Sequence, residues 1–287
     1  MSNSPPKITI VTPSFNQGQF IEQTIKSVID QQYQNFEYLV IDGGSTDGTV
    51  DILRKYDRHI DFWESAPDKG QADAINKGFA RAGGEILAWL NSDDVYEMGV
   101  FAEVAELFQQ QPDIDVISGQ CRLWYGDGRD RMIDPSPLRT LEDFLKINSN
   151  WMKGRLIIQP EAFFRRAAFE KANGVREGLH YCFDACLWMD MAKLGCRFAS
   201  VDRHWANLRM HEGQKTRDLT GGYAEFARVA WDQLLENWSR LQNPVAVAND
   251  IFCALEGLLM KEQKLSSSLL ESTSYRAGRV LTKMRFW

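Results

Sequence analysis

The sequence predicts an α/β fold in which helices cover both faces of a mostly parallel sheet. Short apolar segments alternate with helical segments along the first 110 residues. These apolar segments are hydrophobic at successive positions, which is typical of parallel strands that are buried on both faces. Loops rich in acidic and amide side chains follow the strands, where the ligands of such sheets bind.

Each element in this alternation has its own signal. Residues 17–32 carry apolar side chains at helical spacing, and Gly83-Gly84 is a C-cap signal that ends a later helix. The expected strands are residues 7–11, 37–41, 62–63 and 85–90, and the expected helices are residues 17–32, 48–56, 71–82 and 99–110.

The pattern changes after residue 112. Short segments that favour antiparallel strands, polar loops and longer helices replace the regular alternation. An amphipathic helix over residues 183–195 would place Leu187, Trp188, Met191 and Leu194 on one face. The other expected elements are strands at 115–118, 122–125 and 129–133, a helix at 140–147, a polar and aromatic loop at 148–155, and two long helices within 223–265 that separate near Asn243-Pro244.

Composition limits the class of protein. A net charge of -6 lacks the basic footprint of a nucleic-acid-binding protein. The five cysteines are irregularly spaced, which favours reduced thiols in the cytoplasm over a disulfide framework or a zinc site. The N-terminus has no signal-peptide core, and no window approaches the ~18 apolar residues that a membrane span needs.

Four polar loops are expected to meet at one edge of the sheet. Residues 12–15, Asp42 and residues 91–94 each follow a strand, and residues 68–73 lie between a strand and its helix. Taken singly, each acid has a structural alternative as a turn residue or a helix cap. That alternative explains one loop better than it explains four together.

The adjacent acids Asp93 and Asp94 need a positive partner, because each repels the other and neither belongs in a core. Carboxylates suit a hard divalent cation, Mn²⁺ or Mg²⁺, bound together with a nucleoside diphosphate. No P-loop or dinucleotide fingerprint is present. The loop at 42–53 is no EF-hand, because Asp47 stands where glycine is needed and Leu53 where glutamate is needed.

Three segments carry a resemblance to a known family. TPSFNQGQFIEQTIKSVIDQQY, YLVIDGGSTDGTVDIL and DKGQADAINKGFARAGGEILAWLNSDD resemble the nucleotide-binding half of family 2 glycosyltransferases of the GT-A fold, which has a Rossmann-like, mostly parallel sheet. The resemblance covers residues 7–125 closely and resumes at QPEAFFRR, LHYCFDACLWMDMAKLG and RMHEGQKT.

The resemblance implies the donor site. Pro13, Phe15 and Asp42 would form the base and ribose pocket, and Asp42 suits the imide N–H of uracil or thymine. Asn91 departs from the aspartate of many relatives, so the metal ligands would be Asp93, Asp94 and His211. The residues assigned to the nucleotide and donor sugar are Thr12, Pro13, Phe15, Asp42, Asp68, Gly70, Gln71, Asp73, Asn91, Asp93, Arg209 and Lys215.

The resemblance also implies the catalytic base. The family's base is the aspartate of an Glu-Asp pair that heads a helix, and here the pair is Phe183-Asp184. Cys186 replaces a second acid. A single base fits a single displacement, so Asp184 would take the acceptor proton and the product configuration would be inverted. The alternative for Asp184 is a helix N-cap.

These assignments divide the chain. We predict a GT-A domain over residues 1–218, with a nucleotide-binding half (7–125) and an acceptor half (126–218), and a helical C-terminal extension over 219–287. Residues 275–287 carry four basic side chains and no acid. They would form either an amphipathic anchor on an anionic membrane surface or a solvated tail.

The predicted function is the transfer of a sugar from a UDP- or dTDP-type donor to a saccharide or lipid-linked acceptor, in cell-surface polysaccharide synthesis at the inner face of the membrane. Trp151, Trp188 and Trp205 are candidates to stack on sugar faces, with a core role the alternative for Trp188. A sugar-1-phosphate nucleotidyltransferase is disfavoured, because TPSFNQGQ lacks a basic residue to hold a triphosphate. The lost acids at Asn91, Phe183 and Cys186 leave open an inactive nucleotide-sugar-binding protein.

Overall fold

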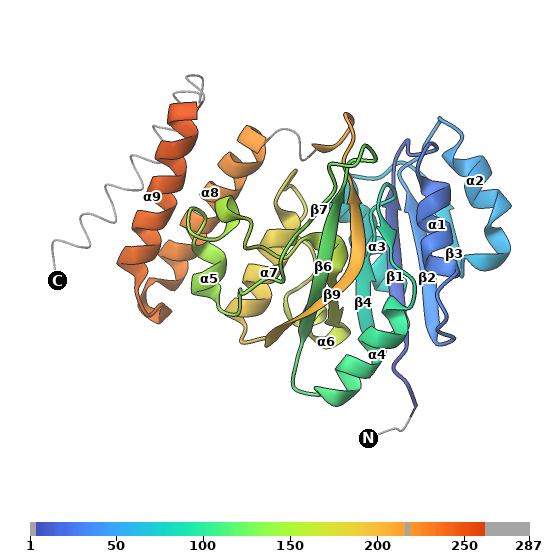
Figure 1. The fold of residues 1–287 in the computed structure, drawn as a ribbon, viewed down its shortest axis with the longest axis horizontal. Coiled ribbons are helices and arrows are strands. Elements are labelled where there is room, and N and C mark those ends of the chain that lie inside the picture. Colours follow the sequence, from blue (N-terminus) through green and yellow to red (C-terminus); the bar gives the residue numbers. More distant parts are fainter. Residues whose placement is uncertain (1–3, 216–218, 262–287) are drawn as a thin grey trace.

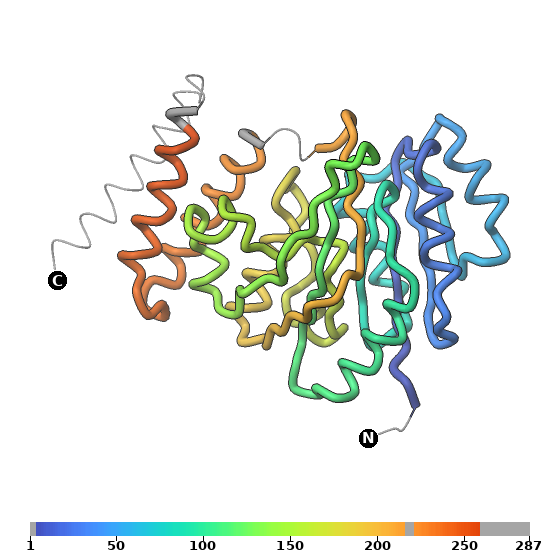
Figure 2. The backbone as a smooth tube through the Cα atoms, in the orientation of Figure 1, coloured from blue at the N-terminus to red at the C-terminus, as the bar shows by residue number. Residues whose placement is uncertain are grey.

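A computed structural model describes residues 4–215 and 219–261, and in that part of the chain one nine-stranded sheet forms the centre (Figures 1 and 2). The strand order is β3-β2-β1-β4-β8-β6-β9-β5, and β7 pairs with β6. The strands are β1 (Ile8–Ser14), β2 (Phe36–Asp42), β3 (Phe62–Ser65), β4 (Ile86–Trp89), β5 (Val95–Tyr96), β6 (Val116–Trp124), β7 (Arg131–Met132), β8 (Ala162–Arg165) and β9 (Phe198–Arg209).

Helices cover both faces of this sheet. One hydrophobic cluster lies under α1 (Ile21–Ile29), α2 (Thr49–Lys55) and α4 (Val100–Gln110). A second cluster lies on the other face and continues into the C-terminal helices, which occupy the opposite end of the molecule from α2 (Figure 1). Its helices are α3 (Gln71–Arg81), α5 (Leu141–Leu145), α6 (Arg166–Lys171), α7 (Phe183–Lys193), α8 (Leu219–Asn237) and α9 (Pro244–Lys261).

The strands are apolar at successive positions because, as expected, both faces of the sheet are buried. Along β2, Leu39 and Ile41 join one cluster while Tyr38 and Val40 join the other, so successive side chains fill both cores. Strands β1–β4 pair in parallel, and the strands beyond them form a mixed part of the sheet. The predicted α/β fold class is confirmed, with the parallel pairing of the N-terminal half as anticipated.

The second half departs from the prediction in its strands. The two segments expected at 115–118 and 122–125 are one strand, β6, because β9 pairs along its whole length. The register shifts between Ser118 and Cys121, at the glycine that separated the two predicted segments. Strands β5, β8 and β9 were not predicted, and each is defined by its pairing with a strand distant in sequence.

Two local expectations were also wrong. Gly83-Gly84 is not a left-handed C-cap: the cap is Ala82, and Gly84 lets two backbones approach, because a Cβ there would lie 2.7 Å from the Thr9 nitrogen. Helix α7 is not amphipathic, because it is buried nearly all round between the sheet and α8. Leu194 falls outside the helix and is 39% exposed.

Helices α8 and α9 pack on α5 and share the hydrophobic cluster of α3, α5, α6 and α7. Phe226 and Trp231 of α8 and Ile251 of α9 are buried in the same cluster as Trp188 of α7. In the part of the chain that the structure describes, no helix is long and apolar enough to cross a membrane. The basic tail at 275–287 lies outside the described residues, so its membrane contact stays a prediction.

Candidate active site

A cavity of about 810 Å³ opens where the carboxyl ends of β1, β2 and β4 meet the start of α7 and one face of α8. The four polar loops predicted to converge all contribute to its wall. Of the predicted site residues, the cavity is lined by Pro13, Phe15, Asp68, Gly70, Gln71, Asn91, Asp93, Asp94, Asp184 and Lys215. Thr12, Asp42, Asp73, Arg209 and His211 are not on its wall, and each lies behind it in contact with a neighbouring group.

Asp42 is fully buried and is held by protein donors. Its carboxylate accepts hydrogen bonds from the Ser45 N–H at 2.8 Å and from the Ser65 hydroxyl at 2.6 Å. The next residue, Gly43, lines the cavity instead. In this structure Asp42 therefore shapes the turn after β2, and its contact with a base stays a prediction.

Thr12 and Asp73 also support the wall from behind. The buried Thr12 hydroxyl accepts a hydrogen bond from the Tyr38 hydroxyl at 3.1 Å. The Asp73 carboxylate binds Lys77 at 2.8 Å and the Lys69 N–H at 3.0 Å, and these partners lower its pKa. Asp73 thus holds the turn that leads into α3, while its predicted donor contact is untested.

A chain of amides crosses the donor end of the cavity. Lys215 Nζ donates to the side-chain oxygen Oε1 of Gln71 at 3.4 Å. Gln71 Nε2 in turn donates to the side-chain oxygen Oδ1 of Asn91 at 2.7 Å. The Asn91 amide nitrogen lies 3.5 Å from Asp94 Oδ2. A carboxylate at position 91 could not donate to Asp94, which gives a physical reason for the departure from aspartate.

The acidic pair is divided between two environments. Asp94 is 1% exposed, and its Oδ1 accepts the Arg209 N–H at 2.9 Å. Burial and the neighbouring Asp93 charge raise the pKa of Asp94 well above its usual value. Asp93 faces the cavity, where its Oδ2 lies 3.0 Å from His211 Nε2. Asp93 is therefore the better placed of the two to meet a ligand.

Arg209 fastens the acidic turn from behind. Its Nε donates to the Asp93 carbonyl at 2.9 Å, and its guanidinium lies 4.2 Å from the Trp124 ring centre and 5.0 Å from that of Phe20. Burial lowers the pKa of Arg209, although the two aspartates favour its charge. The predicted contact of Arg209 with phosphate stays a prediction.

Hydrogen bonds assign the ring tautomer of His211. The Gly213 N–H donates to Nδ1 at 3.2 Å, so Nε2 carries the proton and donates to Asp93. The ring also packs on Phe20 with 4.5 Å between ring centres. Binding a metal through Nε2 would require the proton to move to Nδ1, at the cost of the Gly213 contact.

Asp184 lies on the cavity wall in the first turn of α7. The N-cap of this helix is Cys182, so the alternative interpretation of Asp184 as the N-cap is not supported. Asp184 Oδ1 accepts the Ala185 N–H at 2.7 Å. Desolvation raises the pKa of Asp184 to about 6, and backbone N–H donors only partly oppose this shift. A carboxylate with this pKa can act as a general base near neutral pH.

The structure adds an aromatic end to the cavity that no motif revealed. It is formed by Trp151, Tyr181, Tyr223 and Phe226, with 4.4 Å between the ring centres of Trp151 and Phe226. Of the three tryptophans considered for sugar stacking, Trp151 alone lines the cavity. Trp188 stacks on Trp89 in the core. Trp205 is fully buried and donates to Glu103.

Comparisons with known proteins bear on this arrangement. The sequence profile described as glycosyl transferase family 2 matches residues 9–172, which is more than half of the chain. The chain belongs to glycosyl transferase family 2. The match ends before Asp184, so α7, α8 and α9 lie outside the matched residues.

Family 2 relatives match over part of their length. The chain is 33% identical over 153 residues to the putative teichuronic acid biosynthesis glycosyltransferase TuaG of Bacillus subtilis, covering 51% of this chain and 60% of that protein. It is 32% identical over 174 residues to the uncharacterized glycosyltransferase Rv1514c of Mycobacterium tuberculosis, covering 60% and 63%. The matches therefore span less than two thirds of these relatives.

Solved structures confirm the GT-A fold. S. aureus TarS 1–349 in complex with UDP-GlcNAc aligns with a TM-score of 0.63 at 20% identity, covering 80% of this chain and 66% of that one. The mannosyltransferase PcManGT of Pyrobaculum calidifontis, in complex with GDP-Man and Mn²⁺, aligns with a TM-score of 0.60 at 16% identity, covering 97% and 81%.

Proposed function

We propose that the chain is an inverting, metal-dependent glycosyltransferase that moves a sugar from a nucleoside-diphosphate sugar to a hydroxyl group of an acceptor. The observation that carries this proposal is that the two ends of one cavity offer different chemical groups. Its donor end carries Asp93 and a chain of amides, and its other wall carries Asp184 with a raised pKa. Asp184 forms no ion pair with any residue that the structure describes, so its charge is available to take a proton.

The site and the structural neighbours support a nucleoside-diphosphate sugar as the donor. TarS and PcManGT were solved with UDP-GlcNAc and GDP-Man, which are nucleoside-diphosphate sugars. We infer a UDP- or dTDP-type donor for this chain, bound by the predicted donor residues. The name of TuaG supports an acceptor that is a saccharide or a lipid-linked sugar, in cell-surface polysaccharide synthesis. Such an acceptor fits an enzyme that works on the cytoplasmic side of the membrane.

The residues at the donor end suit a cation that is bound jointly by the protein and a diphosphate. Among the described residues, no three Asp, Glu, His or Cys side chains gather closely enough to hold a metal by themselves. The Asp93 carboxylate and the His211 imidazole do meet, so the protein offers donors that a bound diphosphate would complete. Mn²⁺ or Mg²⁺ would be held by Asp93 with His211, and by Asp94 if its carboxylate turned; it would stabilise the charge of the leaving diphosphate.

The residues of the chain then perform a single displacement. Asp184 accepts the proton of the acceptor hydroxyl while that oxygen forms a bond to the anomeric carbon. The bond from the anomeric carbon to the phosphate oxygen breaks, and its electron pair leaves with the nucleoside diphosphate. Attack opposite the leaving group inverts the anomeric configuration. Residues 7–125 would hold the donor in this scheme, and residues 126–218 would hold the acceptor.

Replacing Asp184 tests the proposal. Asp184→Asn should lower kcat about 10²- to 10⁴-fold, because the amide cannot accept the proton. The control is Asp190→Asn on the same helix, whose carboxylate pairs with Arg176 away from the cavity. It should keep kcat within about threefold. The assay screens UDP-, dTDP- and GDP-sugars for Mn²⁺-dependent donor turnover.

Two outcomes would contradict the proposal. Near-normal turnover by Asp184→Asn would remove Asp184 from catalysis. Binding of UDP with Mn²⁺ but turnover of no donor by the wild-type chain would favour the alternative, an inactive nucleotide-sugar-binding protein.

A further inference from the structure

Helix α8 borders the active site although it lies outside the region matched to the family. Gly222, Tyr223 and Phe226 of α8 line the cavity, and Phe226 packs against Trp151 on the opposite wall. The C-terminal helices therefore contact the acceptor end of the cavity as well as the core.

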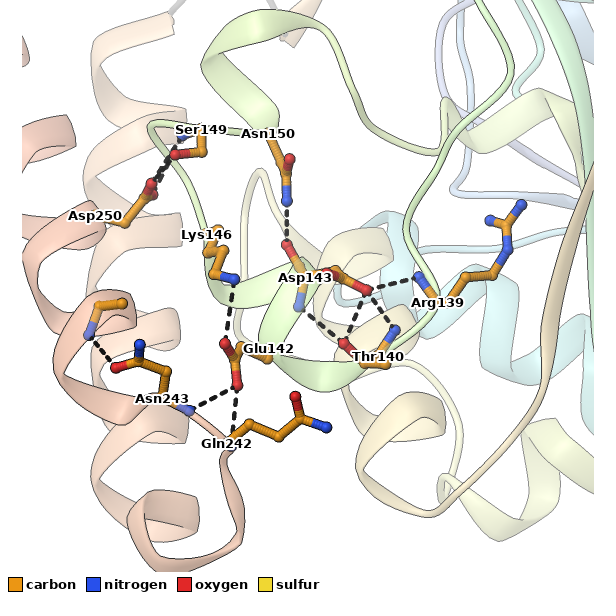
Figure 3. Close-up of polar contacts among 11 residues, drawn as sticks. Arg139, Thr140, Glu142, Asp143, Lys146, Ser149, Asn150, Gln242, Asn243 and Asp250 are labelled. Carbon is orange, nitrogen blue, oxygen red and sulfur yellow. Dashed lines mark hydrogen bonds and ion pairs between the residues drawn. The ribbon is translucent and has the colours of Figure 1, made fainter.

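Three carboxylates tie the α8–α9 pair to the acceptor half through backbone N–H groups. Glu142 accepts the N–H groups of Gln242 and Asn243 in the turn between α8 and α9, at 3.1 and 3.2 Å (Figure 3). Asp250 of α9 accepts the N–H group of Asn148 at 2.7 Å. It also accepts that of Ser149 at 3.0 Å (Figure 3). Both contacts hold the helices in place at a distance from Asp184.

The third carboxylate, Glu225 of α8, is different because of what it binds. Its two oxygens accept three consecutive N–H groups, from His180 at 2.9 Å, Tyr181 at 2.7 Å and Cys182 at 3.0 Å. Burial opposes the charge of Glu225, yet these donors lower its pKa below the usual value. One ionised side chain thus satisfies three successive donors of the loop before α7.

This loop leads directly to the proposed base. Cys182 is the N-cap of α7, and its carbonyl accepts the Cys186 N–H, so the first turn of the helix is set from Cys182. Asp184 lies two residues beyond the last N–H that Glu225 binds. A rigid first turn fixes the direction of the Asp184 carboxylate toward the cavity.

We propose that Glu225 is a positioning residue, which acts through residues 180–182 to hold Asp184 in the orientation that proton transfer requires. This inference rests on the proposed function. A displacement of a catalytic group by about 1 Å can cost on the order of 10²-fold in rate, so loss of the contact should appear in kcat. Among the described residues, the hydrogen bonds that Glu225 accepts come from residues 180–182, not from the donor loops after β1 and β4. Its charge also favours that of Lys215, so we expect at most a small change in donor KM.

The experiment compares Glu225→Gln and Glu225→Ala with the control Glu142→Gln in the full chain. Glutamine keeps one acceptor oxygen, and alanine keeps none. We expect kcat to fall about tenfold in Glu225→Gln and about 10²-fold in Glu225→Ala, with donor KM within about twofold of wild type. Glu142→Gln, on α5, weakens a comparable carboxylate contact to the same helix pair and should leave kcat within about twofold.

Hydrogen exchange of the backbone amides tests the contact between Glu225 and residues 180–182 without an activity assay. The amides of residues 180–182 should exchange faster in both Glu225 variants and at the wild-type rate in Glu142→Gln. In an Asp184→Asn background, Glu225→Gln should lower the residual turnover no further, because both changes act on the same group.

Unchanged exchange at residues 180–182 would show that Glu225 does not hold the loop. Faster exchange with an unchanged kcat, or an equal loss of kcat in Glu142→Gln, would show that the contact is only structural and would overturn the positioning role. If Asp184→Asn retains turnover, the proposed base fails, while the exchange result still decides whether Glu225 holds the loop.

Discussion

The donor and acceptor ends of the cavity are built in different ways. At the donor end, the loop after β4 binds the start of α3 through Asn91 and Gln71, and binds the end of β9 through Asp94 and Arg209. At the acceptor end, Asp184 has backbone partners only, and its surroundings come from α7, α8 and the loop around Trp151. The donor end is a preformed polar network, whereas the acceptor end holds one carboxylate against apolar walls.

This contrast separates binding from chemistry. A network of partnered polar groups can hold a charged ligand with little rearrangement. A carboxylate whose charge is disfavoured by burial is a stronger base than an exposed one. Changes at the donor end should therefore affect affinity, and changes at the acceptor end should affect turnover.

The largest expected effect on ligand binding is at the donor end. Asp93→Asn should weaken Mn²⁺-dependent binding of UDP about 10²-fold, because it removes the cavity carboxylate that contacts His211. Titration calorimetry with UDP in the presence of MnCl₂ measures this loss. Asp115→Asn, whose carboxylate accepts the Arg197 N–H far from the cavity, serves as the control and should bind normally. Equal affinities in wild type and Asp93→Asn would contradict the account.

The fall of kcat/KM at acidic pH should report the ionisation of Asp184 at the acceptor end. Asp184 must be ionised to act as a base, and its pKa is about 6. We expect kcat/KM to fall about tenfold for each pH unit below 6. The affinity for UDP in the absence of an acceptor should not follow that fall. A profile that stays flat down to pH 5 would indicate a different base.

Asn91→Asp should destabilise the donor end in the absence of metal. It places a third carboxylate beside the buried Asp94 and removes the amide donor 3.5 Å away. We expect the free energy of unfolding in urea to drop by about 1–2 kcal/mol, and Mn²⁺ with UDP to recover most of the loss. Asn91→Ala adds no charge and should show no such recovery. A loss in Asn91→Asp that Mn²⁺ leaves unchanged would argue against a cation at this end.

The smallest expected effect is on stability at the acceptor end. Because burial raises the folded-state pKa of Asp184 above its ordinary value of 3.8, the stability it contributes is present below that pH and is lost as pH rises through about 6. Asp184→Asn should therefore be more stable than wild type by about 1 kcal/mol at pH 7.5 and equal at pH 4. Urea unfolding at both pH values measures the difference, and a variant less stable at pH 7.5 would contradict it.

The two ends also differ in how far the sequence predicts them. Strands β1, β2 and β4 are each rich in apolar and β-branched residues, so their order and the convergence of their loops could be predicted from local pattern. The partners of Asp42 and Asp73 could not, because Ser65 and Lys69 reach them only through the folded turns. Those contacts show how an acid after a strand or at the start of a helix can support the cavity wall from behind.

At the acceptor end, the sequence predicted Asp184 through resemblance to a family and Trp151 as one of three candidate tryptophans. Tyr223, Glu225 and Phe226 lie on a helix about 40 residues further along the chain, and no local pattern connects them to Asp184. Strand β9 likewise depends on its pairing with β6, which brings Arg209 and His211 to the acidic turn. The structure of this end depends on contacts between segments distant in sequence. The periodicity of the sequence does not predict such contacts.

The most direct test of the account measures binding and turnover in Asp184→Asn and Asp93→Asn side by side. Calorimetry with UDP and MnCl₂ should give Asp184→Asn a Kd within about twofold of wild type, while its turnover falls at least about 10²-fold. Asp93→Asn should lose the Mn²⁺-dependent part of its UDP affinity. The division of labour is contradicted if Asp184→Asn turns over donor at the wild-type rate, or if Mn²⁺ strengthens UDP binding equally in Asp93→Asn and wild type.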